Sequence, residues 1–450
     1  MQRRYILYTY SLILSIAACN MPRGEAPQYT ISPPLETAAP STTTQAYLNE
    51  TSESDIQSPE TVTAVSEQGT TETQICQSDA GAVVLIVDYE IISDIRRGLT
   101  RFEEDLCRQG FQVFETSGAF TTPVELRTYL SELYVSTGQS LMGAYLIGDF
   151  PHAYQWYRVE YANPDIPPNE QEVISFQYYS DLDGIFTVSA EYTSPGDHLF
   201  SFDIHEGDMD WEIWVSLLPL YRGDTSQTTQ AINRYFEKNH AYRQGEYNLP
   251  RAFLGINELQ TAATRADHDY IMRLLRSGEY AWTPFSEEDN AQIYFNSPTA
   301  GLTVEQGYRS LSEGAADFTA VSTHGTWQSS GSIDTDWVES NPVETVFFIT
   351  SGCSTGDLDH EENFITSALY SPTSLVLVAW GTTSDAGGMG SNADGSYCHN
   401  IAADLSEGKS FGDAILEHVN TPLVHPYSEE RESHFAVQVF LGDPSLTLFP

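Results

Sequence analysis

The sequence predicts an α/β protein with two tandem lobes, in which mostly parallel β-sheets are flanked by helices. Strand-like and helix-like segments alternate between residues 82 and 147, and the alternation resumes after residue 211. Strand–helix–strand units form right-handed crossovers between parallel strands, and this order therefore favours mostly parallel sheets. We place the two lobes at residues 76–235 and 236–450.

The first lobe is predicted to begin with a fully buried strand. Residues 82–87 are a continuous apolar run, as expected of a strand covered on both faces. Apolar residues at the spacing of one helix face follow, and Gly110 ends this helix. The next predicted elements are a strand at 111–114, a helix whose start is marked by Thr122, Pro123 and Glu125, and a strand at 141–147. Residues 163–210 are predicted to form long loops.

The same alternation continues through the second half of the chain. Its predicted strands are residues 211–221, 251–256, 292–295, 318–321, 346–349 and 375–380. Its predicted helices are residues 228–242, 263–275, 304–311 and 364–370.

Composition excludes some classes of partner. The chain has 450 residues with 63 acidic against 20 basic side chains, a formal net charge of -43. Nucleic-acid binding and docking on an anionic membrane both need clustered Lys and Arg, so we expect no nucleic-acid partner. Five cysteines are too few for a disulfide scaffold. Cys76 and Cys107 are candidates for one disulfide, and Cys398 for a buried thiol.

The N-terminus predicts export and lipid anchoring. Arg3 and Arg4 precede an apolar stretch too short to span a membrane, which favours a signal peptide over residues 1–18. Its end, Ile16-Ala17-Ala18-Cys19, resembles the lipobox of bacterial lipoproteins, which implies lipidation of Cys19 and a membrane anchor at the bacterial cell surface or in the periplasm. The alternative is an ordinary signal peptide followed by a coincidental cysteine. Residues 19–75, rich in Ser, Thr and Pro, are predicted to be a disordered tether.

Two predicted strands end in residues that suit acyl transfer. His324-Gly325 follows the strand at 318–321, and Gly352-Cys353 follows the strand at 346–349. Neighbouring parallel strands would bring both ends to one sheet edge, where the imidazole can take the thiol proton. The N–H groups of Gly325 and Cys353 are candidates for an oxyanion hole. Taken singly, a histidine after a strand is often coincidental, and a cysteine there is most often core.

Four segments in order resemble the gingipain branch of the clan CD cysteine peptidases, thiol proteases related to caspases. They are Leu146–Pro151 (LIGDFP), Tyr178–Gly184 (YYSDLDG), Gly352–Asp357 (GCSTGD) and Leu441–Leu446 (LGDPSL). The resemblance implies a caspase-like fold of two lobes with the second catalytic, His324 as base and Cys353 as nucleophile. Thr323 before His-Gly, Gly352 before the cysteine and the lack of a tryptophan after residue 380 depart from the family pattern and leave primary specificity open.

The resemblance also implies two acidic site residues. Glu258 follows a predicted strand where gingipains place a carboxylate that orients the catalytic histidine. Asp267 is the nearest match to the acid at the base of their pocket for basic side chains. A solvated loop acid is the alternative for Glu258, and the helix register that selects Asp267 is open by about three residues.

No metal is required by this chemistry, but calcium binding is possible. Asp181 and Asp183, in an Asp-x-Asp-Gly run, supply the hard oxygen ligands that Ca²⁺ prefers. Neither this run nor Asp208-x-Asp210 completes an EF-hand loop, and solvated acids are the alternative.

Together these features predict a surface-tethered cysteine endopeptidase that hydrolyses extracellular proteins or peptides through a Cys–His thioester mechanism. Polypeptides are the expected substrates. The alternatives are a catalytically weak binding or assembly module, and a sorting transpeptidase in which an amine replaces water.

Overall fold

The computed structural model describes residues 71–76, 81–159, 169–189, 200–258, 291–295, 303–384, 401, 404–405, 407–420 and 437–448. Cys19, the predicted signal peptide, the predicted helix at 263–275 with Asp267, and Cys398 lie outside these ranges. Within the described part, every helix is too short or too polar to cross a bilayer.

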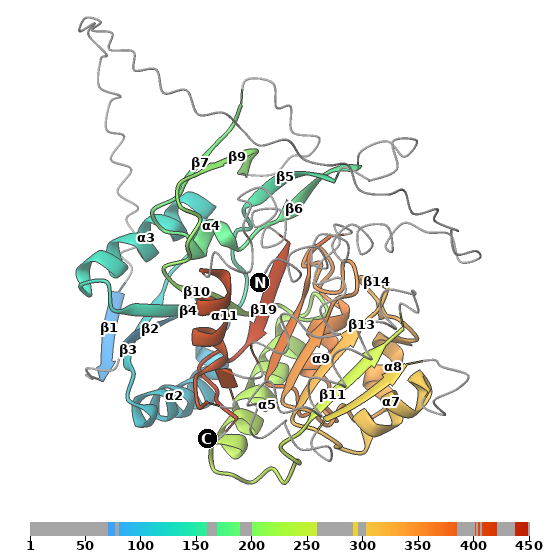
Figure 1. The fold of residues 1–450 in the computed structure, drawn as a ribbon. Helices are drawn as coiled ribbons and strands as arrows, with labels where there is room; N and C mark the ends of the chain where they lie inside the picture. The colour runs from blue at the N-terminus through green and yellow to red at the C-terminus, as the bar shows by residue number, and fades with distance from the viewer. Residues whose placement is uncertain are drawn as a thin grey trace, which may run out of the picture. The chain divides into compact units, whose positions relative to one another are not determined.

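One mixed sheet of eleven strands forms the centre of the fold (Figure 1). Its spatial order is β1-β3-β2-β4-β10-β19-β18-β17-β13-β11-β12. The bounds are β1 Thr71–Cys76, β2 Ala82–Val87, β3 Gln112–Ser117, β4 Leu141–Ile147, β10 Trp214–Leu218, β11 Phe253–Asn257, β12 Ala291–Phe295, β13 Phe318–Ser322, β17 Phe347–Thr350, β18 Val378–Thr382 and β19 Gln438–Gly442.

Apart from β1, which is antiparallel to β3, the sheet consists of two parallel halves that run in opposite directions. Strands β3, β2, β4 and β10 are mutually parallel, and β19 is parallel to β10. β19 is antiparallel to β18, which is parallel to β17, β13, β11 and β12. The predicted α/β class is therefore confirmed, but both halves belong to one sheet. The division into two lobes stays a prediction, and its boundary after residue 235 falls inside helix α5 (Thr225–Arg243).

Five of the described helices form where the sequence pattern places them, at residues 92–109, 123–136, 225–243, 304–312 and 364–370. In α2 (Ile92–Gln109) the apolar positions Ile95, Leu99 and Leu106 are buried, and Gly110 ends the helix in a left-handed conformation at φ 98°. α3 (Pro123–Ser136) begins with the capping box that Thr122 predicts. The other described helices are α4 Gln177–Ser180, α5, α7 Val304–Ser312, α8 Thr335–Ser340, α9 Phe364–Tyr370 and α11 Phe411–Val419.

Short strands occur within the region 163–210 that was predicted as long loops. They are β6 Asn169–Ile174, β7 Ile185–Thr187, β8 Ser201–Phe202 and β9 Ile204–Glu206, and β5 Tyr154–Val159 precedes them. β5 pairs with β6 and β8, and β7 pairs with β9. The prediction of loops was wrong for β6 to β9, where buried aromatic rings pack together; the ring of Phe202 in β8, for example, lies 5.8 Å from that of Tyr178 in α4. A second small sheet contains β14 Gly325–Thr326, β15 Ser329–Ser330 and β16 Ile333–Asp334.

A disulfide joins the first strand to the first described helix. Cys76 at the end of β1 is bonded to Cys107 in α2, with Cα atoms 6.2 Å apart. This confirms the predicted pair. Residues 71–75, the last part of the predicted disordered tether, belong to strand β1, because they pair with β3 in antiparallel register.

A buried carboxylate lies where the two halves of the sheet meet. Asp443, directly after β19, accepts hydrogen bonds from Tyr145 Oη of β4 at 2.7 Å, from Asn239 Nδ2 of α5 at 2.8 Å and from Ser445 Oγ at 2.7 Å. Arg243 of α5 forms an ion pair with it, and both side chains are at least 95% buried. Burial alone would raise the pKa of Asp443, but Arg243 and the hydrogen bonds outweigh it and hold the pKa below its usual value.

We expect Asp443→Asn to lower the free energy of unfolding by about 3–5 kcal/mol at pH 7, because it leaves the Arg243 charge buried without a counterion. Urea unfolding measures this loss, and Glu305→Gln, which removes an exposed carboxylate of α7, is the control. Since the folded-state pKa is depressed, the carboxylate stabilises the protein above pH about 4 and loses this effect as the pH falls through the folded value. The difference in free energy of unfolding between wild type and variant should therefore become smaller in acid. A loss below about 1 kcal/mol at pH 7 would contradict this role.

Candidate active site

The parallel register of β13 and β17 brings the two motif turns to one edge of the sheet. Val321 of β13 pairs with Thr350 of β17, and each strand ends within one residue of that pair. His324-Gly325 and Gly352-Cys353 therefore leave neighbouring strands on the same side. Ser351 N–H donates to Val321 O at 3.0 Å, so the pairing extends beyond the end of β17.

The two turns are in direct backbone contact. A β-carbon placed on Gly325 would lie 2.7 Å from the carbonyl oxygen of Cys353 and 2.7 Å from the carbonyl carbon of Gly352. Only glycine allows this approach. Thr323 N–H also donates to Ser351 Oγ, at 3.3 Å. The structure thus brings together the turn of His324, which is exposed, and the turn of Cys353, which is 3% exposed.

The turn that carries Cys353 is fixed by hydroxyl groups. The carbonyl oxygen of Gly352 accepts from Thr355 Oγ1 and from Thr382 Oγ1 of β18, both at 2.9 Å. Ser354 has φ 56°, a left-handed conformation that is uncommon for a serine, and its N–H donates to Ser384 O at 2.9 Å.

Cys353 is disulfide-bonded in this structure. A disulfide sulfur cannot serve as the attacking thiolate. Exchange with a dithiol reductant supplies the two electrons and two protons that release both thiols, and the reductant becomes a disulfide. The structure therefore shows an oxidised form of the site.

Glu258 lies beside the histidine turn, at the end of β11. Its N–H donates to Ser322 O at 2.8 Å, which continues the pairing of β11 with β13. Its carboxylate accepts from Tyr308 Oη at 2.5 Å and from Ser332 N and Oγ at 2.9 Å each. Gly331, whose N–H donates to His324 O at 2.7 Å, has room for a hydrogen only, because a β-carbon there would lie 2.2 Å from Glu258 Oε1. The carboxylate predicted at Glu258 is thus held next to the residues that form the His324 turn.

An aromatic pair that sequence reasoning missed lies along the same edge. The ring of Trp327, three residues after His324, stacks on His360 with centroids 4.4 Å apart. Trp327 O accepts from Phe364 N at 2.7 Å, and His360 Nδ1 is 3.1 Å from Asp357 Oδ2. Burial raises the pKa of Asp357, Asp359 adds to the rise, and His360 opposes it. The position of Trp327 so soon after His-Gly was the signal available in the sequence.

The predicted metal ligands form a separate cluster. Asp181, Asp183 and Glu212 bring carboxylate oxygens within 4.8 Å of one another. Protein groups already engage Asp181, since its Oδ1 accepts from Gly184 N at 2.5 Å and its Oδ2 lies 2.7 Å from His205 Nε2. Burial raises the pKa of Glu212 to about 7. The hard oxygens fit Ca²⁺, and calcium binding stays a prediction.

Comparisons with known proteins agree with this architecture. A family model described as "Peptidase family C25" matches residues 77–449. Among solved structures, the chain is similar to one titled "Crystal structure of the Arg specific cysteine proteinase gingipain R (RGPB)", with a TM-score of 0.54 and 15% identity over 83% of this chain and 80% of that one. No curated protein matches the sequence. The structural likeness supports the caspase-like fold, and the family match covers both motif turns.

We expect Gly325→Ala to abolish peptide cleavage, because its β-carbon would push the histidine turn away from the Gly352–Cys353 backbone. Initial rates on a peptide substrate, together with the melting temperature, measure the effect. Gly245→Ala is the matched control, since Gly245 also has a positive φ, of 70°, but nothing within 4 Å of the added carbon. Equal activity of the two variants would show that the turns need not touch.

Proposed function

Because the chain belongs to peptidase family C25, a family of cysteine peptidases, we propose that it is a surface-tethered endopeptidase of extracellular proteins or peptides. Cys353 is the proposed nucleophile and His324 the proposed base. The observation that supports this proposal is the close approach of Gly325 to the Gly352–Cys353 backbone at one sheet edge.

The proposed reaction starts from the reduced site. His324 takes the proton of the Cys353 thiol, and the thiolate attacks the carbonyl carbon of the scissile peptide bond. The N–H groups of Gly325 and Cys353 are the proposed donors to the resulting oxyanion. The C–N bond then breaks, the imidazolium of His324 protonates the leaving amine, and a thioester to Cys353 remains. Water, deprotonated by His324, hydrolyses the thioester and restores the thiol.

Glu258 and Asp267 have supporting roles in this proposal. Glu258, held by Tyr308 and Ser332, limits the positions open to the His324 turn and thereby orients the imidazole. Asp267 is proposed to select Arg over Lys before the cleaved bond, because a carboxylate pairs with a guanidinium through two hydrogen bonds. The test is kcat/KM for Arg and for neutral peptides at high salt, measured with wild type and with Asp267→Asn. We expect wild type to prefer the Arg peptide and the variant to lose this preference.

Anchoring and calcium complete the proposal. Lipidation at Cys19 and the tether of residues 19–75 would hold the peptidase at a membrane surface in the periplasm or outside the cell. Cys19→Ala should release it into the soluble fraction, and continued partitioning into detergent would reject the anchor.

Calcium at Asp181, Asp183 and Glu212 should raise the melting temperature, and an unchanged value on adding Ca²⁺ or a chelator would reject that site.

We expect Cys353→Ala to eliminate cleavage, and His324→Ala to lower kcat by about 100- to 10,000-fold, because positioned proton transfer contributes this much. Turnover of a peptide library by reduced protein measures both, with circular dichroism to verify folding. An added amine that appears in the product would identify a transpeptidase. Full turnover by folded Cys353→Ala would refute the nucleophile assignment, and inactivity of folded wild type would favour a binding module.

A further inference from the structure

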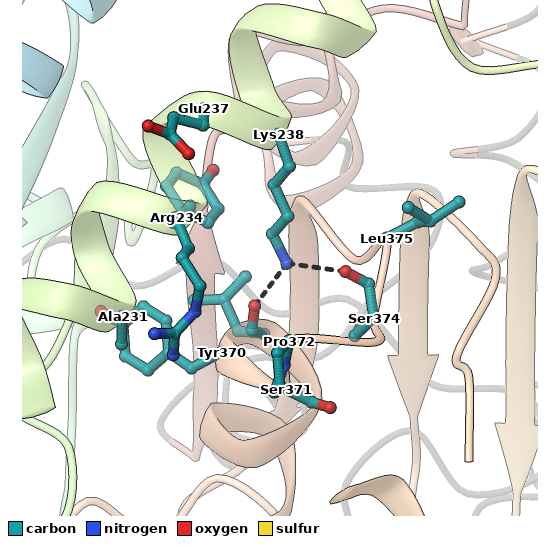
Figure 2. Close-up of a pocket in the computed structure, with 11 residues that line it drawn as sticks. Ala231, Arg234, Glu237, Lys238, Tyr370, Ser371, Pro372, Ser374 and Leu375 are labelled. Carbon is teal, nitrogen blue, oxygen red and sulfur yellow. Dashed lines mark hydrogen bonds between the residues drawn. The ribbon is translucent and has the colours of Figure 1, made fainter.

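A cavity lies at the opposite edge of the sheet from the motif turns. It has a volume of about 250 Å³ and is lined by one face of α5 and by the end of α9 with the turn that follows (Figure 2). That turn ends at Leu375, three residues before β18 begins. Since β18 is parallel to β17, the cavity is at the amino edge of these strands, whereas Cys353 follows their carboxyl edge.

Two cations of α5 line this cavity without a carboxylate partner. Arg234 and Lys238 are four residues apart, so they share one face of the helix. Lys238 Nζ donates to the carbonyl oxygens of Leu369 at 2.5 Å and Ser374 at 3.3 Å, both neutral acceptors (Figure 2). An ammonium has three donors, and one is left for a ligand. Within the described residues neither cation forms an ion pair, although the chain carries 63 acidic side chains.

The pKa of Lys238 is lowered, as expected of a buried ammonium without a counterion. Burial, together with the charge of Arg234, lowers the pKa of Lys238 to about 7. Glu237 on α5 also lines the cavity but does not pair with the ammonium, and the facing α9 contributes Tyr370 as its titratable group. An anion in the cavity would stabilise the protonated form and raise this pKa.

The remaining walls are largely apolar, so an ion alone would leave them uncovered. The apolar lining residues are Ala231, Leu369, Pro372 and Leu375, with the rings of Tyr235 and Tyr370. The volume is slightly below the 300–1,000 Å³ of most small-molecule pockets. We propose that the cavity binds a small organic carboxylate, whose charge meets Arg234 and Lys238 and whose apolar body lies against Leu369 and Leu375.

Fluorine NMR with 4-fluorobenzoate as the probe tests this proposal at pH 6.5. We expect saturable binding that Arg234→Gln weakens at least fivefold and that Glu237→Gln strengthens, because the first removes a cation and the second an anion from the lining. Both sites are exposed, so both variants should fold. The control Arg309→Gln removes an exposed cation of α7 and should leave binding unchanged. The neutral probe 4-fluorobenzamide should bind much more weakly.

The pH dependence gives a second readout. Lys238 is charged below pH about 7, so the affinity for 4-fluorobenzoate should fall as the pH rises from 6 to 8.5. Equal binding of the benzamide, or equal affinity of Arg234→Gln and wild type, would overturn the proposal. These measurements do not involve peptide cleavage, so their outcome is separate from that of the proposed function.

Discussion

The fold depends on one carboxylate at the junction of two half-sheets that run in opposite directions. β19 is parallel to β10 on one side and antiparallel to β18 on the other, so it is the strand through which the halves are joined (Figure 1). Asp443, directly after it, is bound by Tyr145 from the first half and by Asn239 and Arg243 from α5. A buried ion pair is costly to break because the remaining charge has no water to solvate it. The same network therefore makes the relative placement of the halves specific.

The site inherits its geometry from this arrangement. With β18 fixed against β19, Thr382 reaches the carbonyl oxygen of Gly352, and β17 and β13 follow in parallel register. Gly325 can then lie against the Cys353 turn. The left-handed Ser354 is stabilised by the same surroundings, through its bond to Ser384. Strain in one residue of the Cys353 turn is thus balanced by contacts that depend on the whole sheet.

Local sequence patterns were sufficient for most strands of the central sheet, for five of the described helices and for the meeting of the His324 and Cys353 turns. The apolar runs at 318–321 and 346–349 end just before the motif residues, and parallel neighbours place such ends together. The role of Asp443 was beyond this reasoning, although its segment marked the family, because Tyr145 and Asn239 are distant in the sequence. The same holds for the direction of the two halves, since nothing within residues 438–442 specifies which strands β19 joins. The disulfide of Cys353 depends on a pairing that spacing alone does not determine.

The central claim is that His324 and Cys353 act as a coupled pair once the disulfide is reduced. The most direct test is the rate of carbamidomethylation of Cys353 by iodoacetamide between pH 4 and 10, followed by mass spectrometry in dithiol-reduced wild type and His324→Ala. A neighbouring imidazolium stabilises the thiolate, so the wild-type rate should rise with an inflection well below pH 8.5, and the variant's inflection should move toward the ordinary thiol value of about 8.5. Superimposable profiles for the two proteins would contradict the account.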